Sequence, residues 1–222
     1  MLKNFEIILR QIKDEISIMG QKVVYANELS LKAITTSQPK LFSQAKSELN
    51  NLSHTSNKID NLILKALALY SPEAKDLRAL VSYLKITNEI VRAGTNTKSF
   101  IKSFSKSLHT EVDFDNILEF SIPLQKASIG AIKTSINIIG MEDTVSIEKN
   151  FQKVQVEESK TDDLYAMIEK NLLNRISDEI ELSKDYLDIL SSLRRLEKVA
   201  DRAASIANLL VFAQVGGEIH QV

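Results

Sequence analysis

The chain has 222 residues, enough for one large or two small domains. Its 28 basic and 29 acidic residues leave a net charge of −1, which favours neither nucleic acid nor an anionic membrane as a general partner. Cysteine is absent, which excludes disulfides, iron–sulfur clusters and zinc–thiolate sites. With only six glycines and three prolines over this length, the composition predicts long helices with few connections.

The first 20 residues, MLKNFEIILRQIKDEISIMG, mix apolar and charged side chains. A secretory signal peptide needs an uninterrupted apolar core, which Glu6, Arg10 and Asp14 break. No run in the chain approaches the roughly 20 apolar residues that span a bilayer. We therefore expect a soluble, cytoplasmic protein.

The first half of the chain predicts three helices. The first carries one apolar stripe at steps of three and four residues. Its members are Phe5, Ile8, Ile12, Ile16, Met19, Val23 and Ala26. TTSQP (35–39) ends this helix, and a second is expected over residues 40–70. A third follows to about residue 106, with Ser71 as its N-cap and Pro72 in its first position.

The second half predicts three more helices. HTEVDFDN (109–116) is polar and acidic and separates the halves. A fourth helix then runs to about residue 139, and Pro123 predicts a kink in it. The fifth is expected to reach about residue 175 and the sixth to cover 178–215.

Three helices, a break and three helices indicate an internal repeat. A shift of 106 residues aligns similar positions: Leu84 with Leu190, Arg92 with Lys198, and Gly94 with Ala200. The predicted fold class is all-α, a tandem repeat of two three-helix bundles. We expect residues 1–107 to form the first, 112–215 the second, and 216–222 a flexible tail.

Two carboxylates on the last helix, Glu197 and Asp201, share one face just beside the buried stripe when residues are placed at about 100° intervals. That stripe consists of Leu193, Leu196, Val199, Ala200, Ala203, Ile206, Ala207 and Leu210. Like charges four residues apart destabilise a helix unless they are neutralised. One interpretation is a solvated surface on which neighbouring basic side chains neutralise the pair: Arg194, Lys198 and Arg202.

A second pair, Glu158 and Asp162, has the same spacing on the fifth helix. If the two helices are neighbours, four carboxylates converge. Oxygen-preferring cations such as Mg²⁺, Ca²⁺ and Mn²⁺, or iron in a carboxylate-rich site, use such ligands. The alternative interpretation is therefore a metal site.

Two segments, residues 71–94 (SPEAKDLRALVSYLKITNEIVRAG) and 193–210 (LRRLEKVADRAASIANLL), resemble the third and sixth helices of the PhoU family. Matches to its first motif are Pro72, Ala74, Asp76, Leu77 and Arg78. Matches to its second are Leu196, Glu197, Asp201, Ile206 and Ala207. Met19-Gly20 and DDLY (162–165) are also similar to family motifs, while Ser99 and Ser205 stand where the family has asparagine. The resemblance covers nearly the whole chain and implies tandem three-helix bundles.

The resemblance also implies metal binding through E/D-x-x-x-D motifs on the second and third helices of each bundle. The second bundle retains four such carboxylates: Glu158, Asp162, Glu197 and Asp201. The corresponding first-bundle positions are Leu49, Ser53, Val91 and Thr95, and a slip of one residue would recruit only Glu48. Valine offers no lone pair, and the hydroxyls offer only weak neutral oxygens. We therefore predict divalent or iron ions in the second bundle alone.

PhoU-like proteins regulate bacterial phosphate uptake and the phosphate-starvation response. The resemblance implies a phosphate ABC transporter ATPase and a histidine sensor kinase as partners, contacted peripherally at the membrane. Family members occur as monomers and dimers, which leaves a homodimer open. A metal-free helical interaction module that regulates another transporter is the alternative function.

We do not expect an enzyme. A ferritin-like di-iron oxidase would need Glu-x-x-His ligand sets. The three histidines, His54, His109 and His220, have no glutamate three residues before them. The chain also has no Gly-rich phosphate loop, zinc motif or nucleophile elbow.

Overall fold

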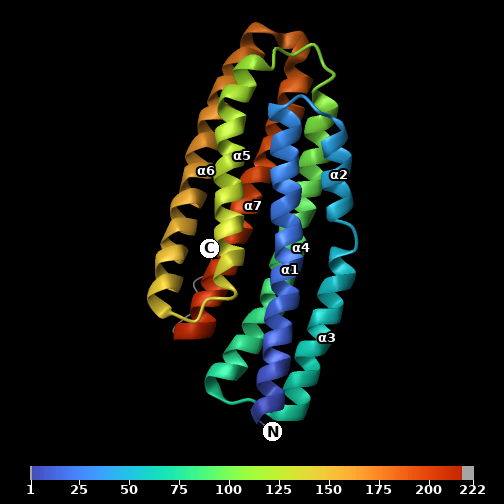
Figure 1. Cartoon of the computed structure of the whole chain (residues 1–222). Coiled ribbons are helices and arrows are strands. Elements are labelled where there is room, and N and C mark those ends of the chain that lie inside the picture. The colour runs from blue at the N-terminus through green and yellow to red at the C-terminus, as the bar shows by residue number, and fades with distance from the viewer. Residues whose placement is uncertain (1, 217–222) are drawn as a thin grey trace.

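The computed structural model describes residues 2–216, and within that range it is helical without strands. Seven α-helices and one 3₁₀ turn follow one another along the chain (Figure 1). They are α1 (Leu2–Thr35), α2 (Lys40–Glu48), α3 (Leu52–Tyr70), α4 (Ala74–Ser107), α5 (Asp115–Ile138), α6 (Thr144–Asp178), η1 (Ile180–Leu182) and α7 (Ser183–Val215). No helix in this range is both long enough and apolar enough to cross a membrane.

The helices form the two predicted bundles. α1, the α2–α3 pair and α4 make the first, and α5, α6 and α7 make the second. The bundles lie side by side, with α4 packed along α7 and α1 beside α5 (Figure 1). The all-α tandem-bundle prediction is confirmed.

The predicted apolar stripes form the core. In α1 every stripe residue is buried except Ile8, which is half-buried, and all the predicted α7 stripe is buried. Small buried residues allow close approach where helices meet. Gly20 of α1 lies against Ile136 of α5, and Gly94 of α4 lies against Leu52 of α3; a methyl group on either glycine would overlap that neighbour.

The predicted second helix is wrong in one respect, because it is broken. α2 ends at Glu48 and α3 begins at Leu52, and between them Asn51 adopts a left-handed conformation with φ 63°. Asparagine tolerates this region better than most residues. The break therefore needs neither glycine nor proline.

The predicted start of the third helix is also wrong. Ser71 does not cap α4 but follows α3 with a left-handed φ of 45°. Pro72 lies before the helix, and Glu73 occupies the N-cap position without a side-chain hydrogen bond. The serine thus reverses the chain after one helix and does not begin the next.

The boundary between α6 and α7 differs from the prediction as well. α6 continues to Asp178, and α7 starts at Ser183 after the 3₁₀ turn. The hydroxyl of Tyr186 donates to Glu179 Oε2 at 2.7 Å and ties this turn to α7. α5 continues through Pro123. Of the predicted tail only Gly216 lies within the described residues, and His220 lies outside them.

Candidate metal centre

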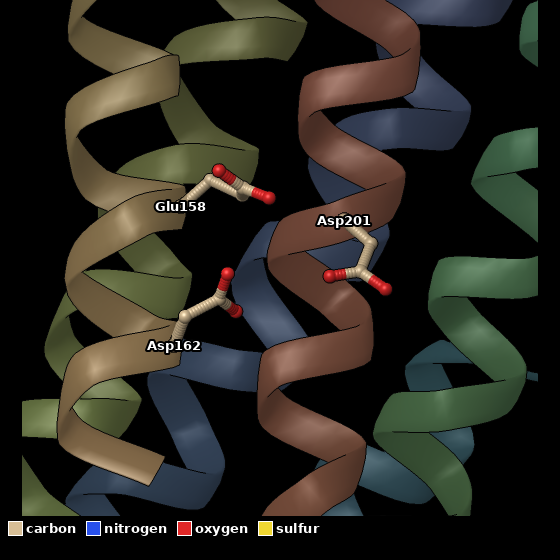
Figure 2. Close-up of side chains that lie close together, drawn as sticks. All are labelled: Glu158, Asp162 and Asp201. Atoms are coloured by element: carbon tan, nitrogen blue, oxygen red, sulfur yellow. The ribbon is translucent and has the colours of Figure 1, made fainter. Parts of the chain in front are cut away.

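Three carboxylates meet between α6 and α7. Glu158 and Asp162 lie one turn apart on α6, and Asp201 faces them from α7 (Figure 2). One oxygen from each lies within 4.8 Å of the other two. Among residues 2–216, this is the single group of three or more acidic, histidine or cysteine side chains close enough to share an ion.

Local packing places these side chains. The Asp143 side chain accepts a hydrogen bond from Ser146 N at 2.9 Å and caps the start of α6. Thr161, which lies between Glu158 and Asp162 in the sequence, is fully buried. Ser128 of α5 donates its hydroxyl to the carbonyl of Leu196 at 2.8 Å, which fixes α7 immediately before Glu197. Both helices therefore present their acidic residues at the edge of the core.

Glu197, the fourth predicted ligand, lies beside the group but outside it. Its Oε2 is 3.7 Å from Arg194 Nε and its Oε1 is 3.6 Å from Lys198 Nζ. Oε2 is nevertheless buried and accepts no hydrogen bond. A buried carboxylate oxygen without a hydrogen-bond donor raises the free energy of the folded state. Glu197 thus has an unfilled acceptor next to the other three carboxylates.

Basic side chains of α7 contact the two carboxylates of the same helix. Lys198 Nζ lies 3.2 Å from Asp201 Oδ2, and Arg202 Nη2 lies 3.7 Å from the same oxygen. All three basic residues that the sequence suggested as counter-charges thus contact Glu197 or Asp201. The neutralised-surface interpretation has geometric support on α7, whereas no ion pair to the α6 members Glu158 and Asp162 exists among the described residues.

The electrostatics of the cluster favour a cation. Partial burial raises the pKa of Glu158, and the negative charges of Asp162, Asp201 and Glu197 raise it further. Burial followed by repulsion from Asp201 raises the pKa of Asp162, although Lys198 opposes the shift. Burial also raises the pKa of Glu197 against the opposing effect of Lys198. A divalent ion would offset the repulsion among these carboxylates.

The donor set consists of oxygens alone. It suits Mg²⁺, Ca²⁺ or Mn²⁺, with water completing the coordination shell. Iron in a carboxylate-rich environment also fits, but no histidine joins the group. The residues present therefore fit the ions that the sequence suggested.

The first-bundle counterparts also come together, but they form a different environment. All four predicted positions, Leu49, Ser53, Val91 and Thr95, line one pocket of about 400 Å³ between the α2–α3 junction and α4. Glu48 is not among the lining residues, and none of them is acidic. The pocket offers no carboxylate for a metal.

One residue near the site was missed by the sequence analysis. Glu89 of α4 accepts from Arg202 Nη1 of α7 at 3.0 Å and from Arg92 at 2.9 Å. Arg202 therefore links the bundles immediately after Asp201. The pair is separated by 113 residues, and no local spacing pattern identifies such a partner.

In comparisons with known proteins, the similarity to the PhoU family extends over most of the chain. The family model for the PhoU domain matches twice, at residues 16–103 and 125–210. A "Phosphate-specific transport system accessory protein PhoU homolog" of Xylella fastidiosa is 22% identical over 218 residues, covering 98% of this chain and 89% of that protein. The Clostridium acetobutylicum protein of the same name is 24% identical over 165 residues, covering 72% and 71%.

Solved structures share the fold. The phosphate transport system regulatory protein PhoU from Streptococcus pneumoniae superposes with a TM-score of 0.81 at 20% identity, covering 98% of this chain and all of that one. PhoU from Pseudomonas aeruginosa gives a TM-score of 0.83 at 18% identity, covering 96% and 100%. At this identity the likeness establishes the two-bundle architecture.

Proposed function

Because the chain belongs to the PhoU family, we propose that it is an accessory, non-enzymatic regulator of phosphate transport. The observation that carries this proposal is the double PhoU-domain match, one to each three-helix bundle. Two relatives named as phosphate-specific transport accessory proteins support it over most of their length. A helical adaptor of this kind acts by presenting surfaces to its partners.

The partners proposed are the ATPase of a phosphate ABC transporter and a histidine sensor kinase. The regulator would contact the ATPase peripherally and reduce uptake and starvation signalling when phosphate is plentiful. This proposal rests on the family relationship, since fold alone does not define a partner.

A divalent cation bound in the second bundle is the second part of the proposal. Glu158, Asp162 and Asp201 would be its ligands, and the unfilled Oε2 of Glu197 supports a fourth contribution after a side-chain rotation. The bound ion would place positive charge on an acidic surface between α6 and α7. That charge would then be available to a carboxylate or phosphate group of a partner.

The contacts of Lys198 and Arg202 with Asp201 favour a second candidate, a metal-free interaction module. In that case the basic side chains neutralise the α7 carboxylates permanently. Regulation would then depend on protein contacts alone.

A pull-down from phosphate-replete cells tests the regulatory role. We expect the tagged chain to recover the transporter ATPase and the sensor kinase, and recovery of neither would contradict the proposal. The same experiment with Glu158→Gln plus Asp162→Asn separates the two candidates. Loss of recovery supports a metal-dependent adaptor, whereas unchanged recovery supports the metal-free module.

A further inference from the structure

The pocket in the first bundle has the size of a ligand site. Its volume of about 400 Å³ falls within the range of pockets that hold small molecules. Its lining residues come from the α2–α3 junction and from one face of α4. They are Leu49, Asn51, Leu52, Ser53, His54, Val91, Gly94, Thr95 and Lys98.

The charge of this pocket is opposite to that of the second-bundle cluster. Its ionisable lining residues are Lys98 of α4 and His54 of α3, and no acidic residue lines it. Within residues 2–216, Lys98 forms no ion pair, and neither Lys98 nor His54 has a side-chain hydrogen-bond partner. Both side chains are exposed, and the pocket therefore presents a solvated ammonium group without an acidic partner where the other bundle presents carboxylates.

Further groups that can donate hydrogen bonds line the same pocket as the lysine. The hydroxyl of Ser53 and the side-chain amide of Asn51 are exposed and have no hydrogen-bond partner among the described residues. Thr95 is not available as a donor, because its hydroxyl donates to the carbonyl of Val91 at 2.9 Å. The Ser53 and Asn51 groups can both donate a hydrogen bond to a ligand, although each can also accept one.

The break in the second helix leaves unpaired backbone amides in residues that line the pocket. The first backbone amide of α3 that donates a hydrogen bond to a residue four positions earlier is that of Thr55, which donates to the carbonyl of Asn51 at 2.9 Å. The amides of Leu52, Ser53 and His54 before it have no acceptor in the described part of the chain. In the second bundle α6 runs unbroken through Glu158 and Asp162 and offers no free amides there. The absent side chain of Gly94 lets Leu52 and this first turn lie close to α4.

We propose that the first-bundle pocket binds a phosphate group, either as inorganic phosphate or as a small phosphate ester. An ammonium group, a hydroxyl, an imidazole and free backbone amides are donors that match the acceptor oxygens of phosphate. The volume leaves room for an organic substituent on the ester. This proposal rests neither on the transport role nor on the cation site, and it assigns opposite ligand charges to the two bundles.

Titration calorimetry on the full chain tests the pocket, with inorganic phosphate, glycerol 3-phosphate and AMP as probes. We expect saturable binding of at least one probe, and the ratio of the affinities distinguishes free phosphate from an ester. Lys98→Met should weaken that binding by about tenfold or more, since it removes a charged donor. Lys102→Met, one turn further along α4 and outside the lining, is the matched control.

A charge-reversal variant gives a second readout. Val91→Glu plus Thr95→Asp introduces two acidic residues into the pocket wall and should abolish phosphate binding. Circular dichroism must show that this double variant keeps its helical fold. Lys98→Met must leave Mn²⁺ binding unchanged, so that loss of phosphate binding and loss of the cation site can be told apart. Absence of binding for all three probes, or equal binding by wild type and Lys98→Met, overturns the proposal.

Discussion

The two bundles share one architecture and differ where their second and third helices face each other. In the second bundle, an unbroken α6 places Glu158 and Asp162 opposite Asp201. In the first, the corresponding helix is interrupted at Asn51, and the pocket wall is neutral or basic. The two bundles therefore share one helix arrangement, while the side chains between their second and third helices differ in charge.

The largest expected effect concerns the acidic half of this comparison. Glu158→Gln plus Asp162→Asn removes two of the three converging carboxylates and should weaken Mn²⁺ binding at least 100-fold, or about 2.7 kcal/mol. Titration calorimetry measures this loss. The matched control is Glu157→Gln plus Asp163→Asn, which neutralises flanking residues outside the group. If both variants bind Mn²⁺ equally well, the ion is not held by this cluster.

In the first bundle, α3 and α4 pack closely where Gly94 lies against Leu52. Gly94→Val would push a branched side chain into Leu52 and should lower the free energy of unfolding by about 2 kcal/mol. Urea denaturation measures the change. Gly140→Ala is the control, because a methyl group at that turn meets no atom within 4 Å. A Gly94→Val protein as stable as wild type would mean that the helices can separate at no cost.

Much of this architecture was predictable because it depends on local periodicity. The buried stripes of α1 and α7 follow from apolar residues at helical spacing. The break at Asn51 was not predicted, because an asparagine in a polar stretch has the sequence pattern of a continuous helix. Left-handed backbone at such a position depends on how the flanking helices pack.

The candidate site was predictable to a similar degree. Spacing on each helix, together with family resemblance, identified Glu158, Asp162 and Asp201, which converge. Glu197 shares a helix face with Asp201, yet its orientation depends on side-chain contacts with Arg194 and Lys198. Spacing alone fixes the face of a helix but not the direction of a flexible carboxylate.

Lys198 adds a positive charge beside the acidic cluster. Its ammonium group contacts both Asp201 and Glu197, so an incoming cation must compete with it. Lys198→Met should therefore strengthen Mn²⁺ binding by about tenfold, or about 1.4 kcal/mol. Lys184→Met, which removes an exposed lysine paired with Asp188, is the control. Weaker binding by Lys198→Met would show that the lysine supports the site.

The smallest expected effect is the pH dependence of the metal-free protein. The pKa of Glu158 is raised in the folded state, first by burial and then by its acidic neighbours. Below the ordinary pKa of glutamate both the folded and the unfolded chain are protonated there, and the residue contributes no pH dependence. As the pH rises from that value through the raised folded pKa, the folded state holds the extra proton, so the free energy of unfolding falls.

Glu158→Gln removes this contribution. Without metal, the variant should lose less stability than wild type between the ordinary and the raised pKa, by under about 1 kcal/mol because the site is partly solvated. Urea denaturation in a chelating buffer across this pH range measures the difference. Saturating Mn²⁺ should reverse the ranking at neutral pH, because the ion stabilises only a chain that binds it. Parallel pH profiles for wild type and variant would instead mean that Lys198 and Arg202 already neutralise the cluster, which would make the two bundles alike in lacking a cation site.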